Sequence, residues 1–458
     1  MRVHDDGFVP KERYVSREFL DLELEHLWSR VWQVACREEE LAGPGDHVDY
    51  AIGDDSIVVV RAASGAIVAF HNTCLHRGRR VVTEPGHVDE RFRCPYHGWC
   101  YALDGTLVDV PDLEEFPSLS VCAETGAVAT RSAQTGEVAG LRLAPVRAET
   151  FGGFVFVNLD TGAPPLLEFL DPLPELLAPY HLERLRFRSY RTTILAANWK
   201  VVVDAFNEGY HVQGLHPQIL PWTDDVAIAY EPLGVHAHYG RLAGARRELR
   251  PSPRLGVADA DVDEGEILAA LVAGLGGAFL AEERALVDEL RAAPRAPGTS
   301  LVEAYQQRRL ALLRDRGVDV SGFTPDQTTS ADDVYWFPNL VGPIYPGSAI
   351  LFRVRPFGRD PDRCIKDTWV LEWPRRDREW RMPERRFHAD WTDHDWGEIT
   401  TQDYENVAQV QLGLKSSACR GVRLNARQEA NILHMHRVID RYLPAPPSPR
   451  SEPRWSRA

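Results

Sequence analysis

The sequence lacks a hydrophobic run long enough to cross a membrane. Its longest uncharged apolar run, Ile267 to Ala281, has 15 residues (281 − 267 + 1), whereas a membrane-spanning helix needs about 18 or more. The sequence also lacks the opening of a secretory signal peptide, a charged segment followed by an apolar one, because Met1 to Pro10 is polar. Both absences lead us to expect a cytoplasmic protein.

Excess positive charge and a disulfide pattern are missing as well. The chain has 52 basic and 67 acidic residues, a formal net charge of −15, which argues against nucleic acid as its main partner. Its seven cysteines are an odd number in 458 residues, which favours a reducing compartment with some cysteines as metal ligands. No GxGxxG fingerprint follows a predicted strand, so we expect NAD(P)H to bind to a separate protein.

Two pairs of cysteine and histidine stand out in a segment rich in short predicted strands. Cys74 to His76 reads Cys-x-His, Cys94 to His97 reads Cys-x2-His, and 17 residues separate the pairs (94 − 76 − 1). Such a set can form a tetrahedral Cys2His2 zinc site, or a Rieske [2Fe–2S] centre with two thiolates on one iron and two imidazoles on the other. Gly78 and Gly98 suit a backbone that wraps closely around a cluster.

A second set of candidate ligands follows a predicted helix that starts at Asn198. Glu208 and His211 are three residues apart and would share one helix face. His211 and His216 are five apart, so they need a loosened turn or a helix end to reach one ion. Two histidines and a carboxylate are the ligands of mononuclear non-haem Fe(II) oxygenases. The plainer interpretation is a pair of surface or packed histidines.

These motifs together resemble the large (α) subunits of Rieske non-haem iron ring-hydroxylating oxygenases, over about residues 10–445. The resemblance rests on Cys-x-His, 17 residues and Cys-x2-His-Gly-Trp-x-Tyr, followed by Asn-Trp-Lys and His-x4-His. It implies one [2Fe–2S] Rieske cluster, with Cys74 and Cys94 on one iron and His76 and His97 on the other.

The resemblance also implies one mononuclear Fe(II), held by His211, His216 and Asp403. Asp403 lies in a downstream acidic motif, with other acids nearby at Asp395, Glu398 and Glu405. An acid at the position of Glu208 is implied to carry electrons between sites, by bridging His211 to His97 of the partner subunit. Such a head-to-tail contact has to close into a ring, most simply a homotrimer.

The expected fold class is α+β. Residues 1–37 are expected to form a helical segment that packs on the catalytic domain, with a helix from Tyr14 to Cys36. A β-rich Rieske domain is expected over 38–160. A catalytic domain over 161–445 should have the helix-grip fold, a curved antiparallel sheet on long helices. Residues 239–326 are expected as a variable insertion over the substrate entrance, and 446–458 as a disordered tail.

The expected function is that of a terminal oxygenase that uses O2 and electrons from NAD(P)H, through a separate reductase and possibly a ferredoxin. We expect hydroxylation of an aromatic or similar cyclic substrate, most simply cis-dihydroxylation in aromatic hydrocarbon catabolism, and a β-subunit is possible. The alternatives are a Rieske monooxygenase or demethylase, a Rieske electron carrier without oxygenase activity, and a structural zinc protein.

Overall fold

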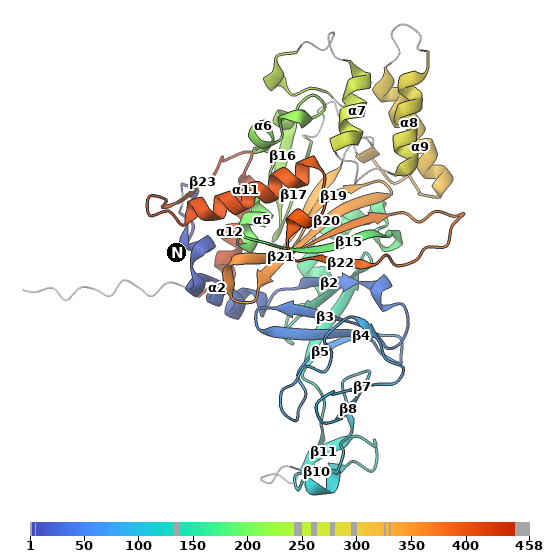
Figure 1. Ribbon diagram of the computed structural model, residues 1–458, viewed down its shortest axis with the longest axis vertical. Helices are drawn as coiled ribbons and strands as arrows, with labels where there is room; N and C mark the ends of the chain where they lie inside the picture. The colour runs from blue at the N-terminus through green and yellow to red at the C-terminus, as the bar shows by residue number, and fades with distance from the viewer. Residues whose placement is uncertain are drawn as a thin grey trace, which may run out of the picture.

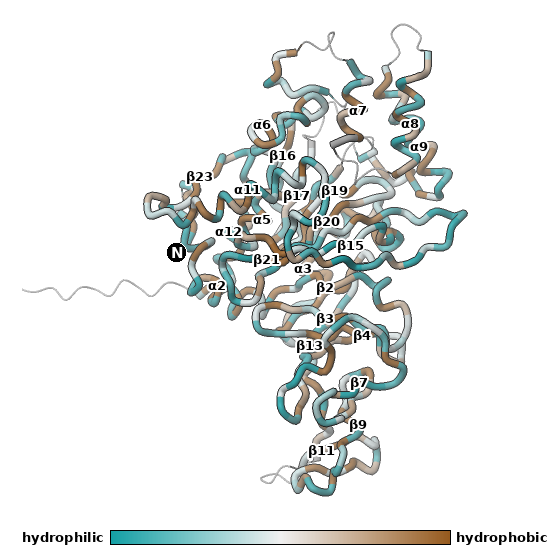
Figure 2. The backbone as a smooth tube through the Cα atoms, viewed as in Figure 1, coloured by the Kyte–Doolittle hydropathy of each residue, from teal (hydrophilic) through white to brown (hydrophobic). Residues whose placement is uncertain are grey.

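The computed structural model describes residues 2–4, 6–131, 138–241, 250–257, 263–274, 280–294, 300–324, 327–328 and 331–444. Figure 1 shows three regions along the longest axis. A β-rich region in blue and cyan lies at one end, a large sheet covered by helices lies in the middle, and helices in yellow and green lie at the other end. Hydrophobic segments run through the middle of the molecule, where the two main sheets meet (Figure 2).

The β-rich region, called here the cluster module, is built on one antiparallel seven-stranded sheet and two small antiparallel sheets. The large sheet has the order β2 (Gln33–Arg37), β14 (Phe154–Asn158), β13 (Pro145–Phe151), β5 (Ile67–His71), β4 (Asp55–Arg61), β3 (Asp46–Ile52) and β6 (Gly86–His87). The small sheets consist of β7 (Arg91–Arg93), β8 (Cys100–Ala102) and β9 (Leu107–Asp109), and of β10 (Leu119–Val121), β11 (Val128–Arg131) and β12 (Val138–Gly140).

The central region is an eight-stranded sheet with long helices on one face. Its order is β16 (Ile228–Leu233), β17 (His236–Arg241), β18 (Asp332–Trp336), β19 (Leu340–Tyr345), β20 (Ser348–Phe357), β21 (Asp360–Glu372), β15 (Arg186–Leu195) and β22 (Arg385–His388). Every pairing is antiparallel except that of β15 with β22. Helix α5 (Trp199–Ala205) packs on β20 and β21, α12 (Ala430–Tyr442) packs on β16 and β17, and α11 (Glu398–Leu414) packs on α5. The expected α+β class and helix-grip arrangement are confirmed.

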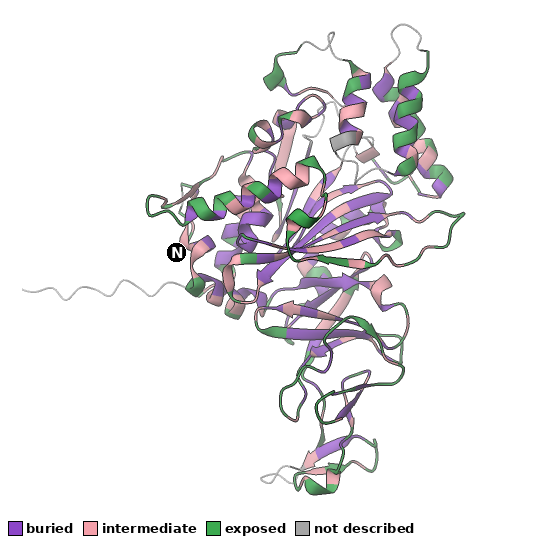
Figure 3. Cartoon of the chain, viewed as in Figure 1, coloured by how far each residue is buried: buried purple, intermediate pink, exposed green. Residues whose placement is uncertain are grey.

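The other face of this sheet packs against the cluster module. Trp336 and Trp369 contact the rings of Phe154 and Phe156 on β14. The side-chain amide of Asn339 both accepts from and donates to the backbone of Val34 in β2, at 3.0 and 3.1 Å. Both sheets are therefore buried where they meet, as the purple strands of Figure 3 show.

The expected helix from Tyr14 to Cys36 is wrong in its second half. The chain forms α1 (Glu12–Val15), α2 (Arg17–Glu23) and a π-helical turn over Leu24–Trp28, and then continues as strand β2. All five residues of β2 are buried between the two sheets, so tertiary pairing overrides the local helical pattern. The cluster module thus begins near residue 33, a few residues before the expected boundary at 38.

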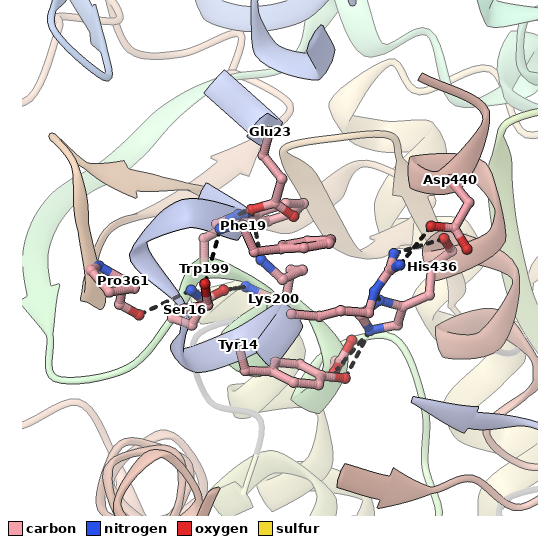
Figure 4. Close-up of polar contacts among 12 residues, drawn as sticks. Tyr14, Ser16, Phe19, Glu23, Trp199, Lys200, Pro361, His436 and Asp440 are labelled. Carbon is pink, nitrogen blue, oxygen red and sulfur yellow. Dashed lines mark hydrogen bonds and ion pairs between the residues drawn. The ribbon is translucent and has the colours of Figure 1, made fainter. Parts of the chain in front are cut away.

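The first helices are fixed to the catalytic region by buried polar contacts. The Lys200 ammonium at the start of α5 donates to Glu23 Oε2 at 2.7 Å, and Trp199 Nε1 donates to the same oxygen at 3.1 Å (Figure 4). Burial raises the pKa of Glu23 and lowers the pKa of Lys200 to about 8, so both charges are costly without each other.

Strands β18 and β19 form a hairpin, because Pro338 forms the turn between them. Between β17 and β18 the chain forms the helices α7 (Glu264–Gly274), α8 (Ala281–Ala292) and α9 (Leu301–Arg316). Residues 446–458 lie outside the described residues. Among the helices that the structure describes, none is both long and apolar enough to cross a membrane.

Candidate functional site

Two similar loops carry the four candidate cluster ligands, one after β5 and one after β7. In each loop the cysteine N–H donates to the carbonyl five residues later, and the glycine four residues later donates back to the cysteine carbonyl, all at 2.8 to 3.0 Å. The glycines Gly78 and Gly98 have φ values of +73° and +80°, a conformation that other residues rarely adopt. Each loop therefore holds its own shape through local hydrogen bonds.

The two loops bring the candidate cluster ligands together. The thiols of Cys74 and Cys94 are both buried, and the rings of His76 and His97 lie 4.4 Å apart. The His76 ring stacks on Trp99 at 5.0 Å, and its buried Nδ1 finds no hydrogen-bond partner in the described part of the chain. Burial raises the pKa of the Cys74 thiol. Two buried sulfurs beside an unpartnered imidazole nitrogen fit a Rieske cluster.

Tyr101 supports the first loop in a way that the sequence did not reveal. Its hydroxyl oxygen accepts from Leu75 N at 2.9 Å and lies 3.2 Å from Cys74 Sγ. Since the oxygen already accepts from the backbone, the hydroxyl proton is free to donate to the sulfur. Tyr101 belongs to the Trp-x-Tyr motif noted in the sequence, but spacing alone could not show which atom its hydroxyl contacts.

The mononuclear site forms where the helix after Asn198 breaks. Helix α5 is capped by Asn198, whose side chain accepts from Lys200 N, and ends at Ala205. The short helix α6 (Val212–Leu215) then separates His211 from His216. His216 lies at the C-terminal end of α6, and such a helix end is one of the arrangements that a five-residue histidine spacing requires.

Helix α11 brings Asp403 to the two histidines, and one atom from each residue lies within 4.8 Å of the others. His216 Nε2 is 2.9 Å from Asp403 Oδ1, and His211 Nε2 is 3.9 Å from the same oxygen. Asp403 and His216 are buried, while Asp395, Glu398 and Glu405 are exposed. The structure thus places Asp403, and none of these three neighbouring acids, beside the histidines.

Hydrogen bonds behind the histidines fix which nitrogen faces the centre. His211 Nδ1 donates to Glu208 Oε1 at 2.6 Å, and His216 Nδ1 donates to Gln402 Oε1 at 2.7 Å. Both Nε2 atoms are then lone-pair donors turned toward the Asp403 carboxylate. Electron-donating atoms that converge in this way fit a divalent metal ion, and ligand histidines commonly have such partners. The sequence did not predict Gln402, because its contact spans 186 positions.

Glu208 also holds the backbone of the turn. Its Oε2 accepts from the N–H groups of Tyr210 and His211. Burial is the largest single effect and lowers the pKa of His211, but the hydrogen bond to Glu208 and the charges of Glu208, Asp403 and Glu429 together raise the pKa overall. Glu208 therefore orients the imidazole and shapes the loop that carries it.

A cavity of about 170 Å³ opens beside this site. Glu208, His211 and Asp403 line it, as do Asp204 from α5 and Glu429 from the start of α12. Apolar residues of α11 complete it: Val407, Val410 and Leu414. The cavity is therefore acidic where it meets His211 and apolar along α11.

The inner face of the sheet presents tyrosines and a carboxylate to the same loop. Tyr230 and Tyr239 stack with ring centroids 5.7 Å apart, and the register of β17 with β18 places Tyr239 opposite Asp333. The Tyr230 hydroxyl accepts from Gly209 N at 3.0 Å, and the Tyr239 hydroxyl donates to Phe206 O at 3.4 Å. Burial raises the pKa of Asp333 to about 7. We call Tyr230, Tyr239 and Asp333 the tyrosine–aspartate face.

Comparison with known families gives two matches. The family described as the ring hydroxylating alpha subunit (catalytic domain) matches residues 182–445. The Rieske [2Fe-2S] domain matches residues 31–121. The two matches follow the division seen in the structure, with β2 included in the first module.

One relative of known activity matches part of the chain. The chain is 32% identical over 222 residues to the glycine betaine monooxygenase oxygenase subunit of Pseudomonas aeruginosa (strain UCBPP-PA14), and the match covers 48% of this chain and 47% of the relative. The chain thus spans about half the length of this relative.

Solved structures share the fold over nearly the whole chain. The quaternary ammonium Rieske monooxygenase CntA in complex with L-carnitine has a TM-score of 0.63 at 18% identity, covering 95% of this chain and 96% of that one. Naphthalene 1,2-dioxygenase from Rhodococcus sp., bound to indole, has a TM-score of 0.60 at 20% identity, covering 95% of each chain. Since both substrate types occur on this fold, the fold does not choose between them.

Proposed function

Because the chain belongs to the ring-hydroxylating α-subunit family, with a Rieske [2Fe–2S] domain ahead of a catalytic domain that binds mononuclear iron, we propose that it is a terminal oxygenase. The cluster supplies electrons one at a time and the mononuclear iron supplies oxygen activation. Cys74, His76, Cys94 and His97 would hold the cluster, and His211, His216 and Asp403 would hold the iron. The observation that carries the proposal is the convergence of these last three side chains.

Electrons would reach the iron site from a neighbouring subunit. Within one chain, the cluster loops next to β7 and β8 lie toward one end of the molecule, away from α5, α6 and α11 (Figure 1). Glu208 lines a cavity, so its carboxylate could accept a further hydrogen bond from His97 of the partner subunit. The subunits would form a homotrimer, in which Glu208 would link the cluster of one subunit to the iron site of the next. A separate reductase, with or without a ferredoxin, would reduce the cluster.

We propose monooxygenation of a small quaternary ammonium compound as the reaction. The initial expectation was cis-dihydroxylation of an aromatic ring, with monooxygenation or demethylation as the alternative. The relative named for glycine betaine and the solved monooxygenase named for quaternary ammonium compounds support the alternative better.

The tyrosine–aspartate face also supports a cationic substrate. An ammonium group is attracted to aromatic ring faces by about 0.5–2 kcal/mol per contact. Asp333 in its ionised form, which a bound cation favours, adds a counter-charge. An aromatic hydrocarbon gains nothing from a carboxylate. Tyr230 and Tyr239 would bind the cation next to the loop of His211, so that one of its carbons faces the iron ligands.

Single-turnover product analysis under labelled O2 tests the substrate class. The reduced protein should convert glycine betaine or L-carnitine with one labelled oxygen per product, and leave naphthalene unchanged. A cis-dihydrodiol of naphthalene carrying two labelled oxygens, with no product from the ammonium compounds, would instead restore the aromatic dioxygenase. Iron analysis separates the remaining alternative, since an oxygenase holds three irons per chain and a pure electron carrier holds two.

A further inference from the structure

A buried chain of hydrogen bonds leads from the N-terminal helices to the cavity beside Glu208. Arg13 Nε donates to His436 Nδ1 at 3.1 Å, His436 Nε2 lies 2.7 Å from the Tyr14 hydroxyl, and that hydroxyl donates to Asp204 Oδ2 at 2.8 Å. Figure 4 shows Tyr14 and His436 turned toward each other. These four residues, called here the donor chain, join α1, α12 and α5.

The direction of every bond in the donor chain is determined. Arg13 can only donate, so His436 Nδ1 must accept. Burial lowers the pKa of His436 well below its usual value, and the nearby Arg13 lowers it further, which makes the ring neutral with its proton on Nε2. That N–H donates to the Tyr14 oxygen, and the Tyr14 proton is left for Asp204.

The donor chain occupies only one oxygen of Asp204. The other oxygen, Oδ1, is buried and finds no hydrogen-bond partner among the residues that the structure describes. Asp204 and Tyr14 both line the cavity that also contains Glu208 and His211. An ionised carboxylate with one unpartnered buried oxygen is costly, and a protonated one costs less.

The groups around Asp204 change its pKa in both directions. Burial is the largest effect and raises the pKa of Asp204, the Tyr14 hydrogen bond and the Lys200 charge lower it, and the charges of Glu429 and Glu208 raise it. The result is a pKa of about 8. The carboxyl therefore holds its proton at neutral pH beside two other acids.

We propose that Asp204 is the proton-carrying residue of this cavity, kept neutral by burial and the neighbouring acids and oriented by the donor chain, and that it delivers a proton that the oxygenase reaction consumes. Arg13, His436 and Tyr14 are positioning residues. This inference rests on the oxygenase function proposed above but not on the identity of the substrate.

The proton balance of a monooxygenase gives this group a role. A substrate C–H, O2, two electrons and two protons yield the hydroxylated product and one water, so protons have to enter a buried site. Asp204 would release its Oδ1 proton into the cavity and take a new one from solvent there. The donor chain cannot refill it, because Arg13 does not deprotonate. The donor chain instead keeps Oδ2 of Asp204 hydrogen-bonded.

The first test needs neither metal nor substrate. Infrared spectra of the purified protein near neutral pH should contain a protonated-carboxyl band that shifts in D2O and is lost in Asp204→Asn. If that variant loses no such band, Asp204 is ionised and the inference is overturned. This outcome would leave the proposed function untouched.

The second test follows reoxidation of the chemically reduced cluster by O2, measured by visible absorbance across pH. In the unmodified protein the rate should fall as pH rises through about 8, because Asp204 then loses its proton. Asp204→Asn should keep its cluster and iron and react about 100-fold more slowly. Its rate should no longer show this decrease with pH, called here the pH limb. An unchanged rate and pH limb in Asp204→Asn would overturn the inference.

Tyr14→Phe separates positioning from mere packing. It keeps the ring but removes the hydrogen bond that favours the ionised Asp204, so the pH limb should move to higher pH. Tyr180→Phe is the matched control, since Tyr180 donates to a different buried carboxylate, Asp332, at 2.6 Å and should leave the limb in place. A limb that Tyr14→Phe does not move contradicts the donor chain.

Discussion

The two candidate metal sites are built in opposite ways. The cluster loops close through their own backbone hydrogen bonds, and His97 at their tip is exposed. The iron site brings together residues 187 positions apart, and His216 and Asp403 are buried. A site that exchanges electrons with partner proteins needs an exposed edge, whereas a site that controls oxygen chemistry needs ligands fixed on rigid elements. We therefore expect single substitutions to affect the cluster loops and the iron site differently.

The largest difference should come from removing Asp403. Asp403→Ala takes the only carboxylate from the group of three, and the loss of a direct ligand should exceed the 10- to 100-fold effect typical of residues behind a metal. We expect loss of the mononuclear iron and of product formation, with the cluster's visible spectrum unchanged. Iron analysis and absorbance check this. Glu405→Ala, an exposed acid two residues along α11, is the control and should be silent. A variant that keeps its third iron would point to a different ligand.

The next effect should appear in electron transfer between the two sites. Glu208→Gln keeps an oxygen that accepts from His211 Nδ1 but loses the charge. We expect both metals to remain bound, and reoxidation of the reduced cluster in the presence of substrate and O2 to slow by about 10- to 100-fold. Stopped-flow absorbance measures this rate. Glu429→Gln, from the same cavity, is the matched control, and an effect as large in that variant would assign the result to cavity charge in general.

A smaller effect should be confined to the cluster. Tyr101→Phe removes the hydroxyl that lies 3.2 Å from Cys74 Sγ, and hydrogen bonds to sulfur stabilise the more negative, reduced state. One hydrogen bond of about 1.4 kcal/mol corresponds to a potential about 60 mV lower for one electron. Redox titration checks the shift, with no change expected in iron content. Tyr96→Phe, which changes an exposed ring in the second loop, should leave the potential unchanged.

The smallest effect should come from the exposed basic residues beside the cluster. Arg77→Glu with Arg79→Glu should slow reduction by the donor protein several-fold at low ionic strength, because opposite charges steer association. The difference should vanish at about 1 M salt, where charges are screened beyond about 3 Å. Arg381→Glu with Arg386→Glu, exposed in the catalytic region, is the control. Equal rates at low salt would exclude this docking surface.

The sequence alone predicted the features that depend on residues close together along the chain. Cys74 to His76 and Cys94 to His97 predicted both cluster loops, since the ligands and the glycines that shape each loop are only a few residues apart. The spacing of His211 and His216 predicted a loosened turn or a helix end, and the structure has the end of α6 at His216. The family resemblance then added Asp403 as a third candidate ligand, which the spacing of the two histidines could not indicate.

Only the tertiary structure decided the contacts made between distant segments. It turned Gln33–Arg37 into a strand, because two sheets bury that segment from both sides. It placed Gln402 behind His216 and Tyr101 against Cys74. It also left one oxygen of Asp204, a residue that lines the cavity, without a hydrogen-bond partner among the described residues. Local sequence fixes backbone preferences over a few residues, whereas burial and long-range hydrogen bonds depend on which segments meet. That difference is why the sequence could suggest the candidate ligands but not the distant residues that hydrogen-bond to them.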